Sequence, residues 1–344
     1  MRAVAYTKEL PTSDAGCFVD IEIERQEPSG FDLLVEIRAV SVNPVDVKRR
    51  ARDDPAGAPR VLGYDGSGMV VATGELAQRF HPGDAVYYAG SLLRPGTNSE
   101  FHLVDERLVG RKPATLSFAE AAALPLTSLT AWELMFERIG LRRRPEPDER
   151  ALLVVGGAGG VGSIAIQLAR QLTGLTVIAT ASRPETRDWC LAMGAHHVID
   201  HSLPMTPQLN NLGLRSVEVI LGLNASDRHL PEIAELIAPL RHFGLIDDAK
   251  GADFGRFKSK SASIHWEFMF TRSSFSTPDM TRQGEILDEL ATLVDEGRLK
   301  STLREIVGPI DAAHLREAHR RLESGRAYGK IVLAEPPGSS GHFV

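Results

Sequence analysis

A glycine-rich turn between an apolar run and a helical pattern is the segment of this chain best suited to bind phosphate. The apolar run is 151–155, and Gly157, Gly159 and Gly162 follow with the spacing G-x-G-x-x-G. Glycines at this spacing permit a tight turn, close approach of the backbone to a pyrophosphate, and close packing of helix on strand. From residue 161, apolar residues recur at i, i+3 and i+4, which predicts a helix whose N-terminus faces the phosphates. The alternative is a turn with a purely structural role. We expect a dinucleotide to contact Gly157, Ala158, Gly159, Gly160, Val161 and Gly162.

The residues after the next predicted strand, 175–180, bear on the choice between NADH and NADPH. An NADH site places an acidic residue there to accept from the ribose 2′-OH. The chain instead reads Ala-Ser-Arg-Pro at 181–184. The Ser182 hydroxyl and the Arg183 guanidinium suit a 2′-phosphate, so the sequence favours NADPH. Two alternatives remain: Ser182 is a helix N-cap before Pro184, a role compatible with phosphate binding, or Arg183 is a solvated surface charge.

Composition excludes several classes of function. The 344 residues are 43% hydrophobic and 24% charged, enough for a sizeable core and two domains. The net charge of −6 gives no electrostatic case for nucleic acid or an anionic membrane as partner. Two cysteines are too few for a disulfide framework or a thiolate metal site. With no signal-peptide pattern and no long apolar run, we expect a cytoplasmic protein without membrane segments.

The pattern of elements changes along the chain. Up to about residue 125 it predicts short strands and turns, with strands at 32–42, 66–71 and 85–88, typical of a partly closed barrel. The glycines of the strand at 66–71 indicate that its backbone comes close to a neighbouring segment. A helix at 131–140 and a linker at 142–150 lead to alternating helices and strands, which predict a parallel doubly wound sheet. Its strands are expected at 151–155, 175–180, 196–199, 217–221 and 241–246.

The remaining elements are assigned to the first region. They are helices at 285–296 and 311–323 and strands at 303–307 and 330–333. The expected α/β fold therefore has a β-rich domain over 1–128 and 277–344 and a cofactor domain over 129–276. Residues 336–344 are expected to form a disordered tail.

Over nearly its whole length the chain resembles medium-chain dehydrogenase/reductases, and five ordered motifs carry the resemblance. They are residues 41–46, 62–68, 80–86 and 121–127 together with the glycine turn. The sequence is most similar to quinone oxidoreductases and zinc-type alcohol dehydrogenase-like proteins. The resemblance implies a GroES-like β-barrel catalytic domain, a Rossmann domain, and a nicotinamide cofactor in the cleft between them.

The chain departs from zinc alcohol dehydrogenases at the metal positions. Asn43 stands in place of a cysteine ligand, Tyr64-Asp65 in place of a His-Glu pair, and the cysteine-free stretch 92–100 in place of a four-cysteine lobe. Catalytic zinc normally has three protein ligands and structural zinc four, so no metal is expected. Hydride transfer without a Lewis acid is easiest to a conjugated acceptor, such as a quinone or an α,β-unsaturated carbonyl.

The resemblance also implies roles near the nicotinamide. Asn43 would donate its amide to the developing oxyanion or orient the nicotinamide, and Tyr64 would donate its phenol or relay a proton. Their alternatives are an Asn-Pro turn residue and a half-buried barrel aromatic. Asp46 is expected to orient a neighbour. Thr127 and Thr130 would contact the carboxamide or ribose, unless their hydroxyls bond back within the start of a helix.

Further cofactor contacts are implied only by the matching positions in the family that the chain resembles. Asn224, Leu245 and Ile246 lie at the carboxyl ends of predicted strands, which face the cofactor crevice. His201 would lie near the adenosine phosphate, with a surface histidine as the alternative. Lys330 would reach the pyrophosphate, with an exposed lysine as the alternative. Residues 268–270 belong to a β-rich run that pairs across a dimer interface in relatives, or else to the core, so a homodimer through the Rossmann domain is expected.

Two other functions stay open at this point. One is a zinc-dependent alcohol dehydrogenase, and the other is a catalytically weak cofactor-binding or redox-sensing protein. Few charged residues are assigned to the substrate pocket, which favours a small apolar carbonyl or quinone without indicating which one.

Overall fold

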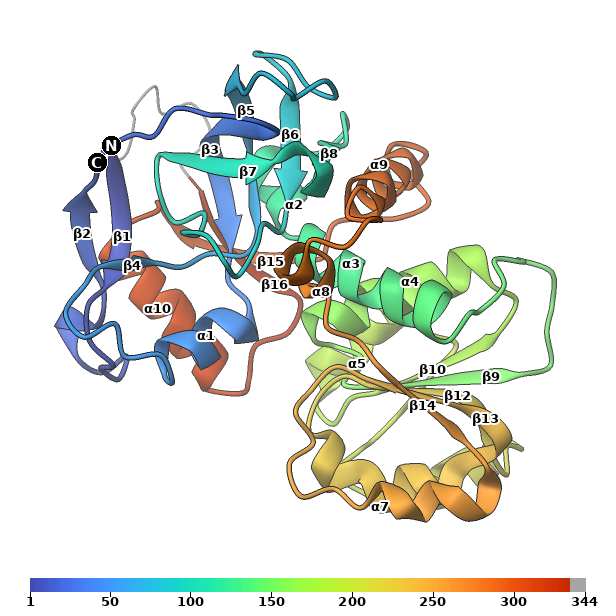
Figure 1. Cartoon of the computed structure of the whole chain (residues 1–344). Coiled ribbons are helices and arrows are strands. Elements are labelled where there is room, and N and C mark those ends of the chain that lie inside the picture. Colours follow the sequence, from blue (N-terminus) through green and yellow to red (C-terminus); the bar gives the residue numbers. More distant parts are fainter. Residues whose placement is uncertain (335–344) are drawn as a thin grey trace. The chain divides into compact units, whose positions relative to one another are not determined.

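The protein is described here from a computed structural model, in which residues 1–334 are described (Figure 1). The expected tail at 336–344 lies outside these residues. The backbone contacts divide the chain into two units. Unit 1 comprises Met1–Leu126 and the residues from Phe270 onward, and unit 2 is Thr127–Met269. The fold is mixed α/β, as the alternation of patterns predicts.

Unit 1 is built on two sheets, and β3 (Asp32–Ser41) is a central strand of the larger one. The larger sheet has the order β15-β16-β3-β5-β6-β8, with β7 also paired to β3, and the smaller has the order β2-β1-β4. The strands are β1 (Arg2–Tyr6), β2 (Val19–Glu22), β4 (Arg60–Val61), β5 (Gly66–Thr73), β6 (Ala85–Tyr88), β7 (Phe101–Asp105), β8 (Val109–Arg111), β15 (Leu303–Gly308) and β16 (Lys330–Ala334). The predicted strands of this region are confirmed, and so is the return of the C-terminal elements, because β16 pairs antiparallel with β3.

Short helices connect these strands. They are α1 (Pro44–Arg50), α2 (Phe118–Ala122), α8 (Thr271–Phe275), α9 (Arg282–Asp295), α10 (Ala312–Glu323) and the 3₁₀ turns η1 (Ala15–Cys17) and η2 (Glu106–Leu108). The close approach expected within β5 occurs at Gly68, where an added Cβ would lie 2.1 Å from the Glu36 carbonyl oxygen. Only glycine lets β3 and β5 pair there.

Unit 2 is a six-stranded parallel sheet of order β11-β10-β9-β12-β13-β14. The strands are β9 (Ala151–Val155), β10 (Thr176–Thr180), β11 (His197–Ile199), β12 (Val217–Gly222), β13 (Ile237–Leu245) and β14 (Ser263–Trp266). The helices are α3 (Pro125–Trp132), which begins in unit 1, α4 (Gly160–Leu172), α5 (Pro184–Ala192), α6 (Met205–Asn211) and α7 (Ser226–Leu236), with the π-helical turn η3 (Glu133–Arg138) and the 3₁₀ segment η4 (Phe254–Lys260). The predicted doubly wound sheet is confirmed, and the strand order reverses between β9 and β12, where ligands bind in such sheets.

Two local predictions need correction. The helix expected over 131–140 is the end of α3 followed by the π-helical turn η3. The β-rich run expected at 268–270 is not a strand, because the edge strand β14 already ends at Trp266. The apolar residues Met269 and Phe270 are instead buried in a turn, whereas Phe268 is 53% exposed.

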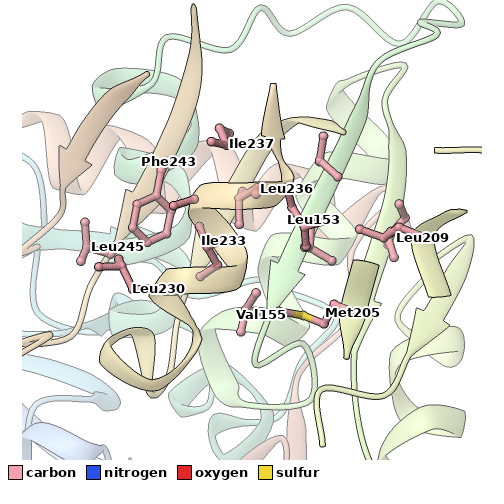
Figure 2. Packing of buried hydrophobic residues seen from close by; sticks show 14 of the residues in the cluster. Leu153, Val155, Met205, Leu209, Leu230, Ile233, Leu236, Ile237, Phe243 and Leu245 are labelled. Carbon is pink, nitrogen blue, oxygen red and sulfur yellow. The ribbon is translucent and has the colours of Figure 1, made fainter. Parts of the chain in front are cut away.

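Apolar side chains fix the sheet of unit 2 against α6 and α7 (Figure 2). Leu153 and Val155 of β9, Phe243 and Leu245 of β13, and Ile233 of α7 belong to this one buried cluster. Each fully buried side chain of this size contributes roughly 1.5–3 kcal/mol, so this cluster holds the carboxyl ends of β9 and β13 in place. Within residues 1–334, no helix combines the length and the apolar character needed to cross a membrane.

Candidate cofactor and active site

The glycine turn connects β9 to α4 through residues whose backbone is fixed by β10. Gly156 has φ +88°, a left-handed conformation that favours glycine. Its N–H donates to Thr180 Oγ1 at 3.0 Å, and the Gly157 N–H donates to the Thr180 carbonyl at 3.2 Å. Gly159 is the N-cap of α4. The free N–H groups and positive dipole end of α4 therefore follow directly on the turn.

The three fingerprint glycines are required for different reasons. An added Cβ on Gly157 would lie 2.7 Å from Ala179 Cβ, and one on Gly162 would lie 2.3 Å from the Gly156 carbonyl oxygen. Among the described residues, a Cβ on Gly159 would meet only that same oxygen, at 3.4 Å. Gly159 is also exposed, whereas Gly157 and Gly162 are buried. The fold itself thus requires Gly157 and Gly162, and the position of Gly159 fits the close approach of a pyrophosphate.

The rest of the turn is accessible and firmly supported. Ala158, Gly160 and Val161 are half-buried. Behind them, Ser163 Oγ donates to the Gly159 carbonyl at 2.7 Å and accepts from Trp189 Nε1 at 2.8 Å. Trp189 belongs to α5, so the start of α4 is held by the neighbouring helix.

Ser182 and Arg183 follow β10, next to the start of α5. Ser182 is exposed. It is not the N-cap that one alternative predicted, because Pro184 is the first helical residue and Arg183 therefore takes the N-cap position. Thr186 Oγ1 accepts from the Arg183 N–H at 3.3 Å and donates to its carbonyl at 2.9 Å. The half-buried Arg183 guanidinium lies 3.4 Å from Glu185, so it is held near the helix start.

The other residues expected at the cofactor lie at the carboxyl ends of strands, as the sheet topology requires. Asn224 follows β12 and lies beside the glycine turn, since a Cβ on Gly156 would be 3.3 Å from Asn224 Cβ. Leu245 ends β13 and is buried, and the Ile246 N–H donates to the Gly222 carbonyl at 3.3 Å.

His201 and two threonines complete the positions expected in unit 2. His201 is half-buried rather than a free surface side chain, and its ring meets His229 edge-on with centroids 5.8 Å apart. Burial lowers the pKa of His201, so the ring is neutral at physiological pH. Thr127 and Thr130 are both buried and lie on α3.

Unit 1 contains a buried ion cluster formed by Ser41, Asn43, Asp65 and Lys330. Asp65 Oδ2 accepts from Ser41 Oγ at 2.8 Å, Asn43 Nδ2 at 2.8 Å and Lys330 Nζ at 3.0 Å. Asp65 Oδ1 accepts from the Leu126 N–H at 2.8 Å. Lys330 also donates to the Val42 carbonyl at 3.1 Å and to Asn43 Oδ1. The cluster therefore joins the end of β3, the residue before β5 and the start of β16 through one buried carboxylate.

This cluster revises the expectations for Lys330 and Asn43. Lys330 is 3% exposed, so the alternative of an exposed lysine is wrong. All three of its N–H donors have acceptors within unit 1, which also contradicts a contact with the pyrophosphate. Asn43 is fully buried and both ends of its amide are occupied. Since Asn43 precedes Pro44 at the N-cap of α1, the structure favours the Asn-Pro turn interpretation over an oxyanion donor.

Asp46 lies next to the ion cluster and fixes two backbone N–H groups. Its Oδ2 accepts from Asn43 N at 2.8 Å and its Oδ1 from Gly63 N at 3.0 Å. Burial raises the pKa of Asp46 to about 7, and Asp65 adds to the increase, while the two N–H groups and Lys330 oppose it. Asp46 thus orients the segments that carry Asn43 and Tyr64.

Tyr64 is a buried side chain of this region that carries a hydrogen-bond donor. It is 3% exposed, and its ring meets Phe270 edge-on with centroids 5.4 Å apart. Burial raises the pKa of Tyr64 above its usual value, and Asp46 adds to the increase, so the phenol stays protonated at neutral pH. Gly63, with φ +117°, sets the turn that precedes it.

Sequence reasoning missed part of this site. It named Asp65 only as the replacement of a glutamate and gave no role to Ser41. The signal was weak: Asp65 lies within the motif 62–68 and Lys330 within Gly-Lys-Ile, but their contact depends on the pairing of β16 with β3. Within residues 1–334, no group of three or more His, Cys, Asp or Glu side chains is arranged to hold a metal ion.

A doubly wound parallel sheet with a glycine-rich phosphate turn, in a chain that also has a β-rich unit with a buried ionic site, defines a class of nucleotide-dependent oxidoreductases. Comparisons with known proteins narrow this class. Residues 29–131 match the family model described as alcohol dehydrogenase GroES-like domain, and residues 193–333 match the one described as zinc-binding dehydrogenase. A zinc-type alcohol dehydrogenase-like protein of Staphylococcus aureus is 37% identical over 335 residues, 97% of this chain and 99% of that protein. The chain belongs to the medium-chain dehydrogenase/reductase superfamily, whose members bind a nicotinamide cofactor.

Other relatives extend the comparison. An NADPH-dependent alkenal/one oxidoreductase of Arabidopsis thaliana is 29% identical, covering 89% of this chain and 72% of that protein. A crystal structure from Rhizobium etli CFN 42, provisionally described as a zinc-dependent alcohol dehydrogenase, has a TM-score of 0.94 at 54% identity and covers 98% of both chains. The fold is shared with Escherichia coli quinone oxidoreductase complexed with NADPH, at a TM-score of 0.81 and 23% identity over 97% of this chain and all of that one.

Proposed function

We propose that this protein is an NADPH-dependent reductase that transfers hydride to a quinone or an α,β-unsaturated carbonyl without a metal ion. The buried ion cluster carries the proposal. By resemblance, Asn43 and Tyr64-Asp65 occupy the metal-ligand positions of zinc alcohol dehydrogenases. The Lys330 ammonium donates hydrogen bonds to two of these residues, Asp65 and Asn43. A fixed positive charge repels a divalent cation, and neither a lysine ammonium nor an asparagine amide nitrogen offers zinc a lone pair.

The geometry of unit 2 supports the choice of cofactor. NADPH, when bound, supplies the hydride. The exposed Gly159 and the N-terminus of α4 would hold the pyrophosphate, while Ser182 and Arg183 would hold the 2′-phosphate. Asn224, beside the turn, would border the same crevice. His201 would lie further along the strand ends, near the adenosine phosphate.

Tyr64 supports the choice of acceptor. A conjugated carbonyl gains negative charge on its oxygen when hydride adds to the far end of the double bond. A buried, protonated phenol can donate a hydrogen bond to that oxygen and then its proton. The name of the Arabidopsis relative, an alkenal/one oxidoreductase, agrees with this acceptor class.

Steady-state kinetics with NADPH and NADH against a panel of quinones and α,β-unsaturated ketones tests the proposal. We expect Arg183→Ala to lower kcat/KM for NADPH roughly 10- to 100-fold, as for the loss of a charge-assisted hydrogen bond, with little change for NADH. Arg170→Ala, at the opposite end of α4, is the control and should change neither. A preference of the wild type for NADH, or no turnover of any acceptor, would contradict the proposal.

We also propose a homodimer through unit 2. The strand β14 is at the edge of the sheet, and Trp266 and Phe268 are each 53% exposed there. An unpaired edge with large apolar side chains is typical of an interface. Light scattering should report a dimer that dissociates in the variant Trp266→Lys. A monomeric wild type would exclude it.

A further inference from the structure

Two histidines on neighbouring strands of unit 2 bring their ring nitrogens together. His242 Nδ1 in β13 lies 3.0 Å from His265 Nε2 in β14, and the ring centroids are 5.2 Å apart. In the parallel register His242 faces Ser263, and His265 faces Gly244. The two histidines are therefore diagonal neighbours on one face of the sheet. Phe243, between His242 and Gly244 in β13, points to the other face and joins the apolar core.

We propose that His242 and His265 form a bidentate site for a divalent late transition-metal ion. Two imidazole nitrogens about 2.05 Å from one metal ion stand about 2.9 Å apart at a right angle and about 3.3 Å apart at a tetrahedral angle. The observed separation of 3.0 Å falls within this range. A metal ion bound here replaces the hydrogen bond between the rings, with both rings neutral and both facing nitrogens unprotonated.

The two histidine rings are accessible to solvent and are packed against neighbouring residues. Both histidines are half-buried. The backbone of Arg138 is close enough to His265 to raise the pKa of its ring, against the larger lowering by burial. Gly244 lies beside His265 with no side chain, and an added Cβ there would meet Leu134 at 2.7 Å. The side chain of Leu134 in η3 therefore packs directly over Gly244, next to His265.

Nearby charges and the number of protein ligands determine how strongly this site binds a metal ion. Arg241 and Arg150 place positive charge near His242, which weakens the binding of a cation. No third His, Cys, Asp or Glu completes the site within residues 1–334, so water or a buffer ligand takes the remaining positions. For imidazole ligands the affinity should rise from Ni²⁺ to Cu²⁺ and fall again to Zn²⁺.

This site is separate from the proposed cofactor site. His242 lies inside β13, whereas the cofactor binds beyond the carboxyl ends of the strands. Metal bound at the histidine pair therefore says nothing about the chemistry at Tyr64. Zinc found in a preparation of this protein supports a zinc-dependent dehydrogenase only if it persists in the variant that lacks both histidines.

Calorimetric titration of the metal-stripped, full-length protein with NiCl₂ tests the site, at a pH about one unit above the usual histidine pKa of about 6.5. We expect one nickel ion per chain, with affinity lowered at least tenfold in His242→Gln and in His265→Gln. His81→Gln removes an exposed histidine of unit 1 and is the control, with binding unchanged.

A spectroscopic measurement on the wild type covers the case in which a variant folds poorly. With one equivalent of Cu²⁺, its electron paramagnetic resonance spectrum should show coupling to two imidazole nitrogens, and coupling to none would contradict the site. A wild type that binds no nickel, or glutamine variants that bind like the wild type, would overturn the proposal. Neither result would affect the proposed reductase activity, which is measured separately.

Discussion

Replacing Lys330 by methionine should destabilise unit 1 by about 3–5 kcal/mol. Methionine keeps most of the length of the side chain and removes the ammonium. Asp65, which is fully buried, would then accept from Ser41, Asn43 and the Leu126 N–H with no opposite charge in contact. Removing one partner of a buried ion pair typically costs this much, because the remaining charge is left uncompensated. For a unit of this size the loss corresponds to a decrease in Tm on the order of 10 °C.

The distribution of tryptophans makes the effect assignable to one unit. Trp132, Trp189 and Trp266 all lie in unit 2. Urea unfolding followed by tryptophan fluorescence therefore reports on unit 2, and circular dichroism reports on both units. We expect Lys330→Met to shift the circular dichroism transition and to leave the fluorescence transition at a similar urea concentration, provided that the units unfold separately.

Two further variants control this experiment. Arg282→Gln breaks a surface pair with Glu285, whose side chains are 33% and 58% exposed in that order. It should change the free energy of unfolding by less than about 0.5 kcal/mol. Asp65→Asn combined with Lys330→Met should recover part of the loss, since neither charge is then left alone. A single variant Lys330→Met within about 1 kcal/mol of the wild type would refute the reasoning about the buried ion cluster.

Two other outcomes are expected. Gly159→Ala should keep the stability within about 1 kcal/mol and weaken NADPH binding at least tenfold, whereas Gly162→Ala should destabilise unit 2 by several kcal/mol, as measured by calorimetry and thermal unfolding. The pKa of Asp46 is about 7 in the folded protein against a usual value of 3.8, so the folded state holds a proton that the unfolded state has released. Its contribution to stability should therefore fall by about 4 kcal/mol as the pH rises from about 4 to about 7, and Asp46→Asn should abolish this slope in urea unfolding curves. Equal slopes in the two proteins would contradict the shifted pKa.

The elements that could be predicted from the sequence are those with a local pattern. The glycine turn, the strand before it and the helix after it follow from residue spacing within a short segment, and the structure has all three. The parallel sheet also follows, because strands and helices alternate. The run at 268–270 lacks such a pattern, because its apolar composition fits both a strand and a buried turn, and the structure has Met269 and Phe270 buried in a turn, as the core alternative predicts.

The buried ion cluster could not be predicted because its members are far apart in sequence. Ser41 and Lys330 both contact Asp65 because β16 pairs with β3, in a register that places Val332 opposite Ser41. A single sequence shows neither the pairing nor the register. The resemblance to the family predicted that Lys330 and Asn43 act at the cofactor. In the structure they are instead hydrogen-bonded to each other and to Asp65.

The pairing of β3 with β16 also determines the order in which the chain can fold during synthesis. Unit 2 is continuous from Thr127 to Met269 and can fold as soon as it leaves the ribosome. At about 5–20 residues per second, Lys330 is added roughly 3–12 s after Met269. Until then Asp65 has no ammonium partner, and residues 39–41 at the end of β3 lack their partner strand β16. Unit 1 can therefore complete its larger sheet only after β16 has been synthesised, and nascent chains that stop before β16 should leave the end of β3 accessible to chaperones and proteases.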